Sequence, residues 1–122
     1  MKKILVIEDS KTIAMVLGQF IGLNGYKVVY AFDAMQAIMF AQRELPDLIV
    51  LDIMMPAGGG FAVVEKLNLA TYTQAIPIIV YTAADIEEVR QKTVGYGIKY
   101  YVQKPDQELV LQYIEDIIGS TA

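Results

Sequence analysis

Four apolar segments of this chain each end in polar residues suited to phosphate or metal chemistry. Glu8–Asp9 follow residues 3–7, Asp52 follows residues 48–51, Thr82 follows residues 76–81, and Lys104–Pro105 follow residues 99–103. If the segments are parallel strands, their carboxyl ends meet at one edge of the sheet, where open α/β sheets bind ligands. The pattern therefore predicts three carboxylates, a hydroxyl and an ammonium group in one crevice.

The three acids favour a bound cation and a phosphoacceptor. Asp9 and Asp52 would leave neighbouring strands a few ångströms apart, and such carboxylates repel unless a cation neutralises them. Mg²⁺ suits the site because it prefers one or two carboxylates together with a phosphate oxygen. With Lys104 and Thr82 available to phosphoryl oxygens, a spare carboxylate can accept a phosphoryl group, since this transfer depends mostly on positioning and charge. Asp52 is the predicted acceptor because it lies between an apolar strand and an irregular loop, whereas Glu8 and Asp9 hold the metal.

Helices are predicted between these strands. Ser10 caps a helix over 11–23 that Asn24–Gly25 ends, and Asp33 caps one over 34–45 that Pro46 ends. The remaining predictions are a strand over 26–31, a helix over 61–70, a capping box of Asp85 and Glu88 on a helix ending near Gly95, and a last helix from Asp106 to about Ile118. Strands alternating with helices at short spacing require right-handed crossovers and a parallel sheet. The central strands are apolar throughout, as expected when helices cover both faces.

Composition excludes several other classes of site. The chain has 122 residues, 55% of them apolar, and a net charge of −4. Without histidine or cysteine it has no histidine-based catalysis, no imidazole or thiolate metal ligands and no disulfide. No basic face for nucleic acid and no apolar stretch long enough for a membrane span is visible. We expect one cytoplasmic domain whose metal, if any, is a hard ion bound by oxygen.

These motifs together resemble the receiver domain of two-component response regulators over essentially the whole chain. The matching residues are Glu8–Asp9, Asp52-Ile53-Met54-Met55-Pro56, Thr82–Ala83 and Lys104–Pro105. The resemblance implies an α/β fold, a flavodoxin-like (βα)5 doubly wound parallel sheet of strand order 2-1-3-4-5. It also implies Mg²⁺-dependent phosphorylation of Asp52 by a histidine kinase or a histidine phosphotransfer protein. Residues 1–122 would form a single receiver domain, with residues 119–122 as a tail or the start of a linker.

The resemblance also implies roles for individual residues around the metal. By position, Asp9 and Asp52 would bind Mg²⁺ directly, the backbone carbonyl of Met54 would be the third protein ligand, and Glu8 would act mainly through water. The Lys104–Pro105 bond matches one that is usually cis in the family.

A switch is implied at the neighbouring strands. Tyr101 matches the switch aromatic of the family. A dianionic group on Asp52 would draw the Thr82 hydroxyl toward it and vacate space into which Tyr101 turns. This local charge change would shift the equilibrium between two conformations of a surface that a downstream protein target binds.

The helix over 11–23 is apolar on almost every face, although a helix that faces a core needs only a stripe. Its surplus side chains either pack under loops or dock the phosphodonor protein; the sequence leaves both open. The last helix carries four acids and no Lys or Arg, which argues against dimers built on charge pairing there. We therefore expect a monomer or a weak dimer.

Three other functions share parts of this pattern. A haloacid-dehalogenase-type phosphatase needs a second Asp two residues after the first, where this chain has Met54. A flavodoxin-type FMN site needs a hydroxyl-rich phosphate loop after the first strand, whereas Glu8-Asp9-Ser10 would repel a phosphate. A receiver-like binding module that never needs phosphate stays open as the alternative.

Overall fold

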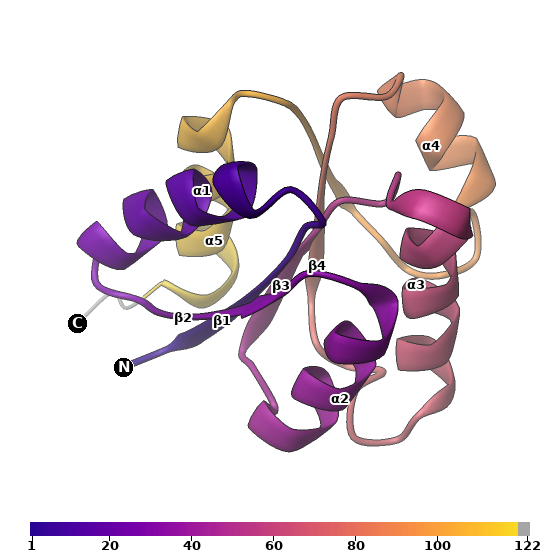
Figure 1. The fold of residues 1–122 in the computed structure, drawn as a ribbon, viewed down its shortest axis with the longest axis horizontal. Coiled ribbons are helices and arrows are strands. Elements are labelled where there is room, and N and C mark those ends of the chain that lie inside the picture. Colours follow the sequence, from indigo (N-terminus) through magenta and orange to yellow (C-terminus); the bar gives the residue numbers. More distant parts are fainter. Residues whose placement is uncertain (120–122) are drawn as a thin grey trace.

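The computed structural model describes residues 1–119 and shows a five-stranded parallel sheet in the order β2-β1-β3-β4-β5 (Figure 1). The strands are β1 (Lys3–Ile7), β2 (Lys27–Ala31), β3 (Leu48–Leu51), β4 (Ile78–Thr82) and β5 (Tyr100–Gln103). The helices are α1 (Lys11–Leu23), α2 (Ala34–Glu44), the 3-10 turn η1 (Pro56–Gly58), α3 (Gly59–Leu69), α4 (Ile86–Lys92) and α5 (Gln107–Ile118). The predicted α/β fold and its strand order are confirmed. Of the tail predicted over 119–122, all but Gly119 lies outside the described residues.

Helices cover both faces of the sheet, so the central strands carry apolar residues on both sides. Figure 1 shows α1 and α5 on one face, with α2, α3 and α4 on the other. Along β1, Ile4 and Val6 pack in the layer of α1 and α5, whereas Leu5 and Ile7 pack in the opposite layer. All four are at most 1% exposed, and burial of such a side chain contributes about 1.5–3 kcal/mol. This double layer holds the ends of β1 and β3 rigidly in place.

Side-chain caps begin three of the helices that follow the strands, at the predicted caps Ser10 and Asp33 and at Asp106, the predicted start of the last helix. Ser10 Oγ accepts from the Ile13 N–H at 3.3 Å, Asp33 Oδ1 from the Gln36 N–H at 2.7 Å, and Asp106 Oδ1 from the Leu109 N–H at 3.1 Å. Gly25 has φ +97°, as predicted for the end of α1. Each cap stabilises its helix by about 1 kcal/mol and fixes the residue at which the helix begins after the loop.

Among the boundaries that differ from the sequence prediction, the starts of β4 and α3 each shift by two residues, at a proline and at a glycine. β4 begins at Ile78 rather than Ile76, since Pro77 has no N–H and Ile76 already bonds back to Thr73. α3 begins at Gly59 rather than Phe61. A Cβ on Gly60 would lie 2.1 Å from the Ile53 carbonyl oxygen, so the glycine allows the helix to start directly against the loop after β3.

The predicted capping box on α4 is wrong. Asp85 occupies the N-cap position, but its side chain makes no capping hydrogen bond, and Glu88 pairs with Lys92 at 3.4 Å instead. The helix also ends at Lys92, short of Gly95; at the C-cap, both the N–H and the hydroxyl of Thr93 donate to the Val89 carbonyl, the hydroxyl at 2.9 Å. Val89 is the one fully buried side chain in this short helix. α4 is therefore the helix least anchored by apolar burial.

The surplus apolar side chains of α1 remain in contact with solvent. Ala14, Leu17 and Ile21 face the core, whereas Met15 and Val16 are 49% and 55% exposed. About half of each of these two side chains therefore stays exposed rather than buried under loops. Among the described residues, no helix is long and apolar enough to cross a membrane.

Candidate functional site

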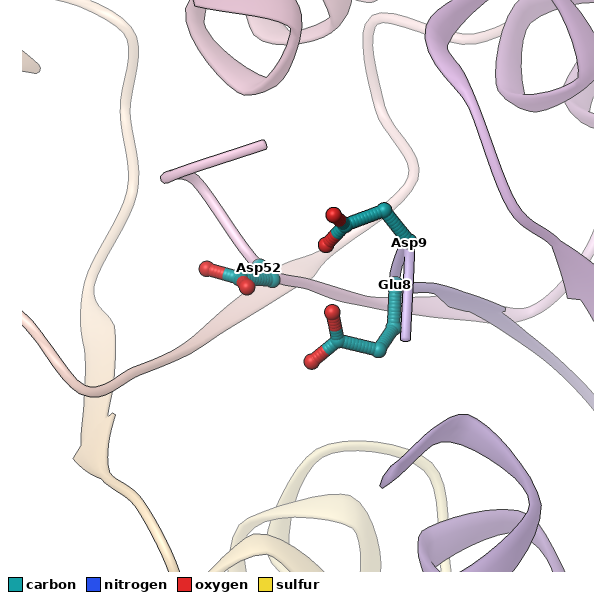
Figure 2. Close-up of side chains that lie close together, drawn as sticks. All are labelled: Glu8, Asp9 and Asp52. Atoms are coloured by element: carbon teal, nitrogen blue, oxygen red, sulfur yellow. The ribbon is translucent and has the colours of Figure 1, made fainter. Parts of the chain in front are cut away.

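Three carboxylates gather where β1 and β3 end. Ile7 pairs with Leu51 in the sheet, so Glu8 and Asp52 leave adjacent strands side by side. One oxygen from each of Glu8, Asp9 and Asp52 lies within 4.8 Å of the others, and Figure 2 shows the carboxylates projecting to the same side. Glu8 and Asp52 are 4% and 8% exposed, whereas Asp9 faces solvent. The predicted acidic cluster is thus present at one edge of the sheet.

Lys104 reaches the same cluster from the end of β5. Its Nζ donates to Asp52 Oδ2 at 3.0 Å and forms a second ion pair with Glu8 Oε1. Its side chain is only 13% exposed. The Lys104–Pro105 bond is cis, as predicted. The ammonium group therefore neutralises part of the acidic charge and bridges two of the three acids.

The pKa values of this group reflect burial in competition with pairing. Burial raises the pKa of Glu8, and neighbouring Asp9 and Asp52 add to that rise, while the bond from Lys104 opposes it. Burial acts to lower the pKa of Lys104, but its bonds to Glu8 and Asp52 outweigh burial and raise it. Lys104 is consequently a permanent cation at neutral pH, and a second cation near Glu8 would stabilise the ionised carboxylate.

Both oxygens of Asp52 already have one partner each. Oδ1 accepts from the Met54 N–H at 3.0 Å and Oδ2 accepts from Lys104. A carboxylate oxygen has two lone-pair sites, so each oxygen retains capacity for a metal or for bond formation. Three clustered acid oxygens match the ligands that Mg²⁺ prefers. The donor set therefore fits a magnesium ion.

Thr82 and Tyr101 lie on the two strands beyond β3. Thr82 ends β4, is fully buried, and its Oγ1 accepts from the Ala84 N–H at 3.1 Å. Tyr101 is 9% exposed, and its hydroxyl lies 2.6 Å from Thr93 Oγ1. The predicted switch requires Tyr101 to turn inward from an exposed position. In this structure the ring is already buried.

Three residues near this region were not identified from the sequence. Arg90 lies 4.7 Å above the Tyr101 ring, Thr93 bonds the Tyr101 hydroxyl, and the amide of Gln103 bonds the carbonyls of Thr82 and Ala84. Arg90 and Thr93 lie about one helical turn apart at the end of α4. This spacing could have indicated that both side chains contact the same residue. Gln103 carries no recognisable sequence signal, since its partners are backbone atoms of β4 and of the turn after it.

Comparison with known proteins agrees with this site. The model of the response regulator receiver domain matches residues 4–115. The chain is 31% identical over 120 residues to Protein PilH of Pseudomonas aeruginosa, covering 98% of this chain and 99% of PilH. It is 34% identical to the phosphate regulon transcriptional regulatory protein PhoB of Escherichia coli, of which it spans 45%, and it spans 24% of the response regulator PleD of Caulobacter vibrioides. The crystallised chemotaxis protein CheY4 of Vibrio cholerae superposes with a TM-score of 0.88 at 27% identity, covering 97% of this chain and 99% of CheY4.

The fold and site define a flavodoxin-like α/β domain with an acidic cluster and a lysine at the carboxyl edge of its sheet. The chain belongs to the response regulator receiver domain family. Receiver domains are signalling phosphoacceptors that interact with histidine kinases or phosphotransfer proteins and with downstream targets.

Proposed function

We propose that this domain accepts a phosphoryl group on Asp52 from a phosphohistidine in a Mg²⁺-dependent reaction. The observation that carries the proposal is the convergence of Asp52 with two further acids and Lys104 at one buried edge. An Asp52 oxygen forms the new bond to phosphorus while the bond from phosphorus to the donor imidazole nitrogen breaks, and the imidazole takes up a proton. The domain catalyses only this step and the later hydrolysis, in which water attacks phosphorus, inorganic phosphate leaves and the Asp52 carboxylate is restored. It is therefore a signalling phosphoacceptor rather than an enzyme with turnover.

The metal would be held by Asp9, Asp52 and the backbone carbonyl of Met54, with Glu8 acting through water. When bound, Mg²⁺ neutralises charge on the phosphoryl oxygens. Lys104 pairs with one of those oxygens, and the Thr82 hydroxyl donates to another. These residues thus position the group and balance its charge, which is the main requirement for phosphoryl transfer.

Loss of the Asp9 charge should weaken Mg²⁺ binding. Asp9→Asn keeps the side-chain shape but removes one of three clustered charges, so we expect at least a tenfold weaker Mg²⁺ affinity. The measurement is thermal unfolding against Mg²⁺ concentration: saturating ion raises the wild-type stability by about 2.7 kcal/mol at 100 times its dissociation constant. Equal Mg²⁺ stabilisation of wild type and variant would contradict this metal site.

The exposed side chains of α1 are proposed to dock the phosphodonor protein. Ile13, Met15 and Val16 are apolar side chains, 39%, 49% and 55% exposed, on the helix that follows Glu8–Asp9. A donor helix packed there would bury apolar area next to Asp52. The partner is thus a histidine kinase or a histidine phosphotransfer protein.

A charge at an exposed apolar position of α1 should separate protein donors from small donors. For Met15→Glu and Val16→Glu we expect transfer from a phosphorylated donor protein to slow by roughly a hundredfold, since a charge replaces a buried apolar contact. Phosphorylation by acetyl phosphate should stay within a factor of two, because neither side chain reaches the site. Equal losses with both donors would contradict docking at α1.

Thr82 and Tyr101 are proposed to couple Asp52 to a partner surface. The structure places Tyr101 inward from the outset, so the coupling would act by changing how firmly α4 and β5 hold the ring. For Thr82→Ala and Tyr101→Ala, we expect phosphorylation to lose its effect on binding of the downstream target. The measurement is target affinity with and without a phosphoryl group on Asp52; an intact response in both variants contradicts the coupling.

The alternative is a receiver-like binding module that needs no phosphate. The two functions are distinguished by incubating the protein with acetyl phosphate and Mg²⁺ and measuring its mass. One added phosphoryl group supports the acceptor, and no addition under any donor supports the passive module. We propose a cytoplasmic monomer or weak dimer that does not bind nucleic acid through this domain, and a single domain over 1–122.

A further inference from the structure

The turn after β4 carries Thr82 and leads into α4. Within it, Thr82 Oγ1 accepts from the Ala84 N–H at 3.1 Å, so the hydroxyl oxygen is oriented by its own turn. The Thr82 carbonyl also accepts from the Lys104 N–H at 2.8 Å, which joins the turn to the residue after β5. The position of the Thr82 hydroxyl therefore depends on what holds this turn against β5.

Gln103 holds the turn from the end of β5. Its Nε2 donates to the Thr82 carbonyl and to the Ala84 carbonyl, at 3.1 Å each. Both partners are carbonyl oxygens, so only the NH₂ end of the amide can make these bonds, and it uses both of its hydrogens. One side chain thus joins the first and third residues of the turn to the strand that also carries Lys104.

A separate contact holds the far end of α4. Tyr101 lies two residues before Gln103 and therefore on the same face of β5. Its hydroxyl bonds Thr93 at 2.6 Å, and Arg90, which also pairs with Glu87 at 3.4 Å, lies over its ring. Val89 and Ile86 of α4 pack in the same core layer as Tyr101, so the polar contacts at the two ends of residues 82–93 add to this apolar packing.

We propose that Gln103 is a positioning residue of the phosphoryl-transfer site. It acts through Thr82: by fixing both carbonyls of the turn, it holds the hydroxyl in the place from which it donates to the phosphoryl group. This inference rests on the proposed function for its effect on the reaction. The two hydrogen bonds by which Gln103 holds the turn do not depend on phosphorylation.

Gln103→Met tests the proposal because it keeps side-chain length and removes both donors. In unphosphorylated protein, we expect the Ala84 and Val89 amides to exchange with deuterium about fivefold faster, while the Thr93 amide, at the end held by Tyr101, is unchanged. Gln91→Met is the control: Gln91 is an exposed residue of α4 with no side-chain hydrogen bond among the described residues. Gln103→Leu should repeat the result.

The second measurement is phosphorylation by acetyl phosphate at saturating Mg²⁺. We expect Gln103→Met to slow it about fivefold with Mg²⁺ affinity unchanged, and to have no further effect in a Thr82→Ala background. Additive losses in the double variant, or unchanged exchange at Ala84, would overturn the proposal. If wild type accepts no phosphoryl group, the proposed function fails, while the exchange experiment alone still decides whether Gln103 fastens the turn.

Discussion

Asp52→Asn should abolish phosphorylation completely. The amide keeps the shape of the side chain and its bond from the Met54 N–H, but its nitrogen is not a nucleophile and its charge is gone. With acetyl phosphate and Mg²⁺, we expect the wild type to gain the mass of a single phosphoryl group and the variant to gain none. Because asparagine has the shape of aspartate and keeps the bond from the Met54 N–H, the variant should fold normally.

The same substitution should make the metal-free protein more stable. Glu8, Asp9 and Asp52 repel one another, and Lys104 compensates only part of their charge. Removing one negative charge lowers this repulsion, so we expect the free energy of unfolding without Mg²⁺ to rise by about 1 kcal/mol.

Asp116→Asn, an equivalent change on the exposed face of α5, is the matched control. It should leave both phosphorylation and stability unchanged. A phosphoryl group still added to Asp52→Asn would place the acceptor elsewhere.

Gly60→Ala should be the most destabilising single-methyl substitution near the site. The added Cβ would lie 2.1 Å from the carbonyl oxygen of Ile53, which is fully buried and directly follows Asp52. Backbone on both sides of the contact must move, so we expect a loss of about 3 kcal/mol and a fall in Tm of roughly 10 °C. The same movement displaces Asp52, and Mg²⁺ should stabilise the variant less than the wild type.

Gly22→Ala is the matched control for this change. Gly22 is an exposed helical residue of α1, and a Cβ there meets nothing within 4 Å. Alanine favours helix over glycine, so we expect stability to rise by up to about 1 kcal/mol. Thermal unfolding of both variants measures the difference, and a Gly60→Ala protein as stable as wild type would refute the close approach of α3 to Ile53.

The site residues could be found from the sequence because each follows an apolar strand. Parallel strands bring their carboxyl ends to one edge, so the positions of Glu8, Asp52 and Lys104 in the chain were enough to predict that they meet. The caps at Ser10, Asp33 and Asp106 were equally local, since each side chain bonds a backbone N–H three residues later.

Local patterns failed where the partner is distant in the chain. Gly60 suggests a loop by its helix propensity, yet it is helical because α3 packs against the Ile53 carbonyl. The failed capping box of Asp85 and Glu88 is a different case, because Glu88 pairs with Lys92 only four residues later, so one local interaction replaces another. At Gly60 the tertiary contact outweighs the low helix propensity of glycine, so the residue is helical.

The sequence alone determined the fold class, the strand order through its family resemblance, and the set of groups at the sheet edge, because these follow from periodicity and from where strands end. Only the tertiary structure decided that Lys104 bridges Glu8 and Asp52, that Tyr101 is buried against Thr93, and that Gln103 holds the Thr82 turn. These contacts join side chains to atoms of other strands and helices, and their geometry depends on how the whole sheet packs rather than on any spacing along the chain.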